Sequence, residues 1–286
     1  MKTKAVKQKR IGKFLLNMLF IVACCLYLFP IYLILTNSFK SRSEMYANMT
    51  ALPPQLTFKY YASALSKINF FTSLRNTLVL TVVSIFIIVI LTSMTAWMIA
   101  RHKCRMSTFI FDILIATMLI PFQTIMMPLM QEMNGIEGLT GLQMTDSIPG
   151  LIFMYIGFGA GMGVFLYHGF VNSIPVSIEE AAIIDGCSTG QVFWKIVFPN
   201  MKPTTVTVII LDVIWIWNDY LLPSLTLKAK ANRTIPISTA KFFGQYTISW
   251  NEAMAALVVT ITPVIIFYLI CQKYIVKGVA AGAVKG

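Results

Sequence analysis

The sequence predicts an all-α membrane protein that crosses the bilayer six times. Hydrophobic residues make up 57% of its 286 residues and charged residues only 12%, whereas a soluble domain carries about a quarter charged residues. Several apolar runs reach about 20 residues, the length at which a helix spans the hydrocarbon core. Basic residues gather at the ends of these runs, where they act as orientation signals.

The first predicted span covers residues 13–36. The N-terminal stretch MKTKAVKQKRIGK carries six basic residues and no acidic residue. The uncharged run that follows, from Phe14 to Thr36, is 23 residues long, whereas the hydrophobic region of a signal peptide holds only about 7–15. We therefore expect a retained transmembrane helix. Residues 1–13 precede it as a basic cytoplasmic segment, and residues 14–286 form one transmembrane domain.

Five further apolar runs complete the predicted bundle. The third span carries Asp112 near one end and Pro121 in its interior, and the fifth carries Asp212 and Asp219. The fourth contains clustered glycines, which allow helices to approach each other closely. These spans are expected at residues 75–100, 107–131, 147–172, 204–224 and 253–272.

The distribution of basic residues predicts the orientation of the chain. With the N-terminus inside, the inner segments hold 14 of the 23 Lys and Arg residues and the outer segments hold 9. The bias is strongest at the first helix, which usually decides the topology. Both termini and the loop 173–203 are therefore expected in the cytoplasm.

Composition also excludes several classes of function. The net charge of +12 does not indicate nucleic-acid binding, because no basic domain with interleaved aromatic residues is present. The five cysteines form no C-x-x-C pair and accompany no histidine cluster, so we expect neither a disulfide framework, a metal site nor a cofactor. Signatures of an intramembrane enzyme, such as an H-E-x-x-H helix or a nucleophile elbow, are missing, and no catalytic residue is expected.

The loop 173–203 contains EEAAIIDGCSTGQVFWKIVFPNMKP at residues 179–203. Ser177 and Glu180 have the spacing of a capping box, and so do Ser188 and Gln191. Gly186 suits a left-handed helix end. The loop is therefore expected to form two short helices separated by Asp185 and Gly186. These patterns leave open whether the first helix is an amphipathic connector or a docking element for another protein.

This stretch resembles the EAA loop of ABC importer permeases, in which E-A-A and D/G precede hydrophobic residues and I-x-L-P. Phe198 stands where leucine is usual, and the matching residues are Glu180, Ala181, Ala182, Asp185, Gly186, Ile196 and Pro199. The stretches WIWNDYLLP (215–223), FPIYLILTNSFK (29–40) and AAGAVKG (280–286) resemble the carbohydrate branch, the maltose and multiple-sugar permeases. The last is similar to the ending of the shorter of two permease subunits.

The resemblance implies the type I ABC importer permease fold in a bacterial cell membrane. It implies four kinds of partner besides lipid: a second permease in a heterodimer, two cytoplasmic ATPases, an extracellular sugar-binding protein and the sugar itself. The implied sugar is a di- or oligosaccharide of the raffinose or multiple-sugar type. The chain has no G-x-x-x-x-G-K-[ST], so ATP hydrolysis is expected on separate chains. The residues implied to contact the ATPase are Glu179, Glu180, Ala181, Ala182, Asp185 and Gly186.

Span five holds the candidate substrate path. Trp217, Asn218, Asp219 and Tyr220 are expected to form it, because acidic residues within a span usually face a cavity or another protein group. In the other reading, Asp219 lies at the outer interface, where Trp217 and Tyr220 are interfacial aromatics. The alternative function is an ion-coupled secondary transporter that uses Asp112, Asp212 and Asp219.

Overall fold

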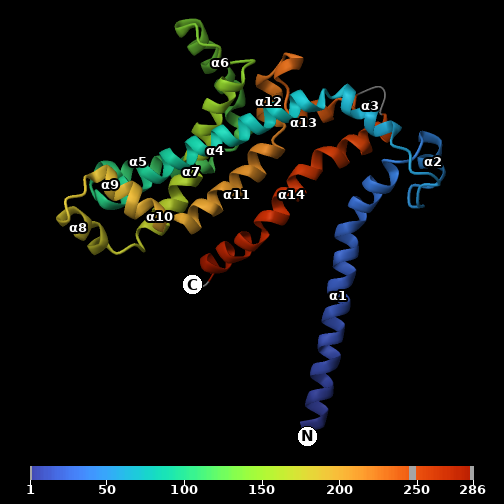
Figure 1. The fold of residues 1–286 in the computed structure, drawn as a ribbon, viewed down its shortest axis with the longest axis horizontal. Helices are drawn as coiled ribbons and strands as arrows, with labels where there is room; N and C mark the ends of the chain where they lie inside the picture. Colours follow the sequence, from blue (N-terminus) through green and yellow to red (C-terminus); the bar gives the residue numbers. More distant parts are fainter. Residues whose placement is uncertain (1, 245–248, 284–286) are drawn as a thin grey trace. The chain divides into compact units, whose positions relative to one another are not determined.

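The computed structural model describes the backbone of residues 2–244 and 249–283 and the side chains of residues 12–244 and 249–272. The C-terminal residues 284–286 of the AAGAVKG stretch lie outside it. Throughout the described residues the regular structure is helical (Figure 1). The helices are α1 (Lys2–Asn37), α2 (Arg42–Ala47), α3 (Lys59–Lys67), α4 (Phe70–Arg101), α5 (Arg105–Leu119), α6 (Phe122–Thr140), α7 (Ile148–Val171), α8 (Val176–Ile184), α9 (Thr189–Val192), α10 (Phe198–Asn200), α11 (Lys202–Asn218), α12 (Leu221–Thr226), α13 (Ile235–Ala240) and α14 (Trp250–Ala283), with a π-helical turn at Phe193–Val197 and a 3-10 turn at Lys230–Asn232.

Two compact units make up the chain, residues 1–68 with 239–262 and residues 69–238 with 263–286. The first unit contains α1, α2, α3 and the beginning of α14. There Lys67 Nζ pairs with Glu252 Oε2 at 2.6 Å, and Ser63 Oγ donates to Glu252 Oε1 at 2.6 Å. These bonds fix α3 to the first turn of α14.

The second unit is built on α4 and α7, which pack along each other, with α5 against α7 and α11 against both (Figure 1). Glycines of α7 allow this close approach. A Cβ added at Gly159 would lie 2.6 Å from Ile88 Cδ1 of α4, and one at Gly161 would lie 2.6 Å from the Leu114 carbonyl oxygen of α5. The glycine cluster of the fourth span therefore serves helix packing, as the sequence predicts.

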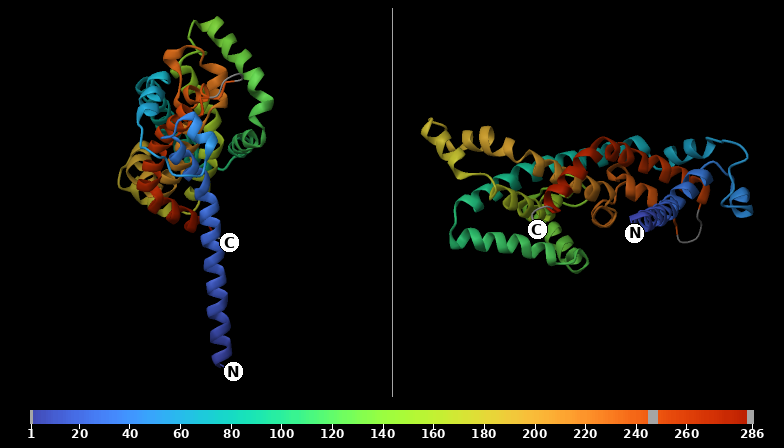
Figure 2. Two further views of the ribbon diagram at one scale, coloured as in Figure 1. Left: turned by 90° about the vertical axis from the view of Figure 1, so that its right-hand side faces the viewer. Right: turned by 90° about the horizontal axis from the view of Figure 1, so that it is seen from below.

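Four described helices are long and apolar enough to cross a membrane alone, and six crossings result if each of two bent pairs is one span. The third predicted span, 107–131, is not one straight helix: α5 and α6 meet at an angle of 109° (Figure 2). Proline causes the break, because Pro121 has no N–H and its ring keeps Ile120 extended, at φ −83° and ψ 118°.

The fifth predicted span, 204–224, also differs from the structure. Its helix ends at Asn218, and the short helix α12 begins at Leu221. At its beginning, α11 is bent by 73° from the preceding helical segment, residues 189–200. Asp219 lies between the two helices, and its Oδ1 accepts the amide of Leu221, the first residue of α12, at 2.9 Å. This bond stabilises the break after α11.

Candidate functional site

The loop 173–203 forms a helix, a glycine turn and a second helical segment. Its first helix, α8, begins after Pro175, and within α8 Ser177 makes no capping bond. The predicted Ser177–Glu180 capping box is therefore wrong: the proline, whose fixed φ suits a helix start, takes the cap position and moves Ser177 into the first turn. The Ser188–Gln191 capping box at the start of α9 is confirmed.

Gly186 ends α8 in the left-handed conformation, with φ +85°. The Cys187 amide donates to the Ala182 carbonyl at 2.9 Å, and the Gly186 amide donates to the Ile183 carbonyl at 3.0 Å. These two bonds form a Schellman motif, which satisfies carbonyls at the helix end. The predicted role of Gly186 as helix terminator is confirmed.

One face of α8 and its end are exposed. Glu180, Ala181, Asp185 and Gly186 all lie on the surface. Two large apolar side chains join them, because Ile183 is 59% exposed and Ile184 is 85% exposed. We call residues 180, 181 and 183–186 the α8 tip. The tip combines exposed isoleucines with two carboxylates, a composition typical of a surface that another protein covers.

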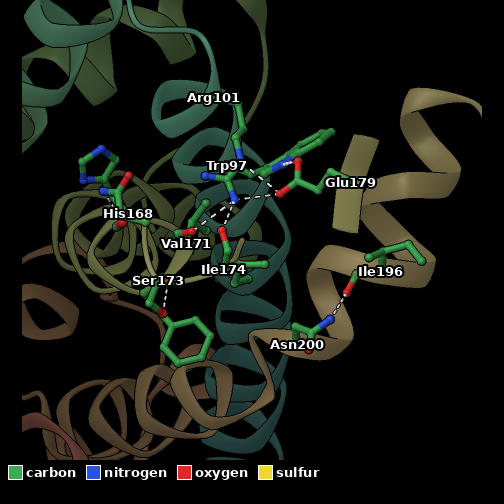
Figure 3. Close-up of polar contacts among 11 residues, drawn as sticks. Trp97, Arg101, His168, Val171, Ser173, Ile174, Glu179, Ile196 and Asn200 are labelled. Atoms are coloured by element: carbon green, nitrogen blue, oxygen red, sulfur yellow. Dashed lines mark hydrogen bonds and ion pairs between the residues drawn. The ribbon is translucent and has the colours of Figure 1, made fainter. Parts of the chain in front are cut away.

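Glu179 and Ala182 face the opposite way and are buried. Glu179 Oε1 accepts Arg101 Nε at 2.9 Å and Arg101 Nη2 at 2.7 Å, and its Oε2 accepts Trp97 Nε1 at 2.9 Å (Figure 3). Of the six residues implied to contact an ATPase, the structure therefore presents four on the tip and places two inside.

Arg101, the last residue of α4, holds three segments together. Besides Glu179 it donates through Nη2 to the carbonyls of Val171 at 3.2 Å and Ile174 at 3.0 Å (Figure 3). It therefore connects α8 to the ends of both α4 and α7. The sequence does not reveal this role, because basic residues at the ends of apolar runs, such as Arg101, indicate only the orientation of the chain.

Trp97 connects the same end of α4 to the second half of the loop. Its ring packs on Phe193, with 5.3 Å between centroids and an interplanar angle of 39°. Phe193 opens the π-helical turn and is buried at 2% exposure. π-Helical turns often occur at functional sites, so this turn is a further indication that the loop is functional. The sequence did not reveal it.

The four residues predicted for the substrate path do not share one surface. Trp217 is buried, Asn218 bonds to the Ile214 carbonyl of its own helix, and Tyr220 is half exposed. Asp219 Oδ2 accepts the Tyr155 hydroxyl of α7 at 2.8 Å. The structure thus joins Asp219 to α7, and the side chains of Trp217, Asn218 and Tyr220 take no part in that bond.

Asp212, in the middle of α11, lies beside a pocket. Asp212 is 4% exposed, and its Oδ2 has no hydrogen-bond partner among the residues that the structure describes. The pocket has a volume of about 370 Å³, and its other lining residues are Met118, Phe158, Gly159, Met162, Leu211 and Trp215. Asp112, by contrast, is exposed on α5. The acidic residues of the ion-coupled alternative therefore have three different environments, and no group of His, Cys, Asp and Glu in the described part of the chain could hold a metal ion.

Comparison with known proteins identifies one transport family and several permeases that are similar to this chain. A model of the "binding-protein-dependent transport system inner membrane component" family matches residues 88–281. A probable starch degradation products transport system permease protein, AmyC of Thermoanaerobacterium thermosulfurigenes, is 45% identical over 98% of this chain and all of its own. The melibiose/raffinose/stachyose import permease protein MelC of Bacillus subtilis is 32% identical over 95% of this chain and 96% of its own.

A multiple sugar-binding transport system permease protein, MsmG of Streptococcus mutans, is 32% identical over 98% of this chain and 99% of its own. Among solved structures, a chain of a bacterial ABC transporter that imports the acidic polysaccharide alginate has the same fold, with a TM-score of 0.81 at 24% identity over 93% of this chain and 96% of that chain. These relatives are transport permeases, not enzymes. The chain therefore belongs to the family of binding-protein-dependent transport system inner membrane components.

Proposed function

We propose that this chain is one of two membrane permeases of an ATP-driven sugar importer, for a di- or oligosaccharide. The sugars in the names of the similar permeases support the substrate class. In this proposal, a second permease forms the translocation path with it, and an extracellular binding protein delivers the sugar. Two cytoplasmic ATPases supply the energy.

The α8 tip is the surface that would dock on an ATPase. Ile183 and Ile184, at 59% and 85% exposure, would enter an apolar cleft. Glu180 and Asp185 flank them and would favour a basic rim around that cleft. Burial of exposed apolar side chains stabilises association, and the charged rim adds specificity. The loop 173–203, and with it both termini, would then lie in the cytoplasm.

The inner face of α8 would transmit the force. A short helix that docked on an ATPase but was loosely attached to its own bundle would move without moving the bundle. Here the Arg101 guanidinium bonds Glu179 of α8 and carbonyls at the end of α7, and it belongs to α4. Because α4 and α7 pack along each other, a displacement of the tip reaches the centre of the second unit. This attachment of an exposed tip is the observation that carries the proposal.

The test is to copurify the chain with its partners and measure sugar-stimulated ATP hydrolysis and sugar uptake in vesicles. Glu180→Lys should abolish stimulation while the protein still inserts in the membrane. Glu132→Lys is the matched control, since Glu132 is exposed on α6 and the charge change is the same. Full stimulation in Glu180→Lys would contradict a docking role for the tip. No stimulation of the wild-type complex by any neutral or acidic oligosaccharide would contradict the importer itself.

A further inference from the structure

The pocket beside Asp212 lies within the second unit, among three helices. Its apolar wall includes Met118 of α5, Phe158 and Met162 of α7, and Trp215 of α11. Its volume of about 370 Å³ lies in the range of small-molecule sites. Among the described lining residues, Asp212 is the only one with a charged group, and the indole N–H of Trp215 is the only other polar side-chain group.

Asp212 is costly where it stands. A carboxyl group withdrawn from water needs hydrogen-bond donors, and Oδ2 of this residue has none in the described part of the chain. Membrane proteins retain such groups where they face a cavity or a ligand. A ligand that brings hydroxyl donors into the pocket would supply the missing bonds.

Trp215 stands three residues after Asp212, so the two side chains leave α11 on neighbouring positions of one face. The Tyr155 ring packs edge-on to the Trp215 ring, with 5.4 Å between centroids and an interplanar angle of 86°. The Tyr155 hydroxyl is in turn held by Asp219 at 2.8 Å. Trp215 is therefore a fixed aromatic surface beside an acceptor, and it remains 39% exposed.

This pair of groups matches one chemical class. A sugar ring has a face of C–H groups, which packs on an aromatic surface, and a rim of hydroxyl groups, which donate hydrogen bonds to a carboxylate. Within the described part of the chain, no lining residue of the pocket carries a positive charge. The sequence contains no Lys or Arg from Met106 to Trp194, and α11 carries only Lys202, at its first position. An anionic sugar would meet the Asp212 carboxylate without a counter-charge.

We propose that Asp212 and Trp215 form a subsite for one ring of a neutral sugar on the translocation path, and that the subsite excludes acidic sugars. Asp219 and Tyr155 act as positioning residues that orient Trp215. This inference rests on the proposed function and adds to it a substrate class and a location. It also reassigns Asp219, from a residue that lines the path to one that supports it.

The test uses the complete transporter in proteoliposomes, with raffinose and maltotriose as neutral probes and trigalacturonate as the acidic probe. Asp212→Ala and Trp215→Ala should each raise the KM for uptake of the transported neutral sugar about tenfold or more, because each removes a contact to the ring. Asp212→Asn keeps an acceptor oxygen without the charge. It should raise the KM less, and it should reduce the preference for neutral over acidic sugar. Asp112→Asn is the matched control on α5 and should transport as the wild type does.

The outcomes separate this inference from the proposed function. Wild-type KM values in both alanine variants would overturn the subsite while uptake by the wild type left the importer intact. Loss of copurification of the second permease from Asp212→Ala and Asp212→Asn alike would also overturn it, because the carboxylate would then pair with a cation of that partner. Tyr155→Phe removes only the hydroxyl, and a KM unchanged in that variant would overturn the positioning role of Asp219.

Discussion

Two neighbouring glutamates show how differently adjacent residues are used. Glu180 is exposed on the α8 tip, whereas Glu179 is 5% exposed and bonded to Arg101 and Trp97. The cause is the geometry of a helix with 3.6 residues per turn, which directs consecutive side chains about 100° apart. A surface glutamate and a buried one therefore follow each other in the sequence. Glu179 has a structural role that the motif alone does not reveal.

Removal of Glu179 should destabilise the protein. Glu179→Ala leaves the Arg101 guanidinium and the Trp97 indole N–H without their partner, and loss of one member of a buried ion pair costs about 3–5 kcal/mol. The thermal midpoint of the purified protein in detergent should fall clearly in this variant. Glu180→Ala is the matched control and should leave the midpoint unchanged.

A second variant distinguishes pairing from packing. Arg101→Met combined with Glu179→Leu removes both charges and fills similar volume, so it should recover part of the stability that Glu179→Ala loses. An equal fall of the thermal midpoint in Glu179→Ala and Glu180→Ala would show that the buried pair contributes nothing.

At the scale of elements, Gly186 decides where α8 ends. Glycine adopts its φ of +85° without strain, whereas a residue with a Cβ is strained at this angle. Gly186→Ala should lower the free energy of unfolding of the loop by about 1–2 kcal/mol, because alanine is strained in this conformation. It should also reduce sugar uptake, because the α8 tip would no longer have the conformation that docks on the ATPase. Hydrogen exchange of the loop amides is the measurement. Gly190→Ala, in helix α9, is the control and should be neutral or stabilising, since no atom lies within 4 Å of the added Cβ.

The contact between α5 and α7 depends on Gly161 in the same way. A Cβ at this position would lie 2.6 Å from the Leu114 carbonyl oxygen, a backbone atom that moves only with its helix. Gly161→Ala should therefore cost about 1–3 kcal/mol of stability, seen as aggregation at a lower temperature in size-exclusion chromatography. Gly157→Ala introduces the same methyl group on α7 without any atom within 4 Å. If both variants aggregated at the same temperature, the tight packing would be refuted.

At the scale of the whole molecule, long-range polar bonds hold the segments between helices. Asp146, which precedes α7 with φ +50°, accepts the amides of Lys228 and Ala229 through Oδ1, both at 2.9 Å. It thus ties two segments more than 80 residues apart in the sequence. Burial alone raises the pKa of the Asp146 carboxyl, but the bonds from Ala229, Lys228 and Asn232 outweigh it and hold the pKa below its usual value.

This contact should give the stability a dependence on acid pH. Because the pKa is lower in the folded state, the stabilisation is complete above the unfolded value of about 3.9 and is lost as the pH falls through the folded value. The wild type should therefore exceed Asp146→Asn in thermal midpoint at pH 6, and the difference should shrink as the pH is lowered below the unfolded value. Asparagine is the appropriate substitution, because it retains the acceptor and tolerates the left-handed conformation. A constant difference at all pH values would exclude the charge as the cause.

The apolar surface of the long helices indicates that lipid surrounds them. Among the residues that the structure describes, none of the hydrophobic window of α1 is buried, and half of each window of α4 and α7 is buried. The sequence predicted these helices from uncharged runs, since composition alone determines whether a segment can lie in lipid. It did not predict the 109° bend at Pro121, because a proline within an apolar run either kinks a span or ends it.

The sequence by itself determined what depends on near neighbours. The apolar spans, the Gly186 helix end and the Ser188–Gln191 capping box all depend on residues close together in the chain, so a short pattern contains the whole interaction. The tertiary structure alone decided that Glu179 pairs with Arg101, 78 residues away, and that Asp212 opens into a pocket among α5, α7 and α11. Those contacts depend on how each helix is rotated about its axis and where it crosses its neighbours, which only the packing of all the helices together defines.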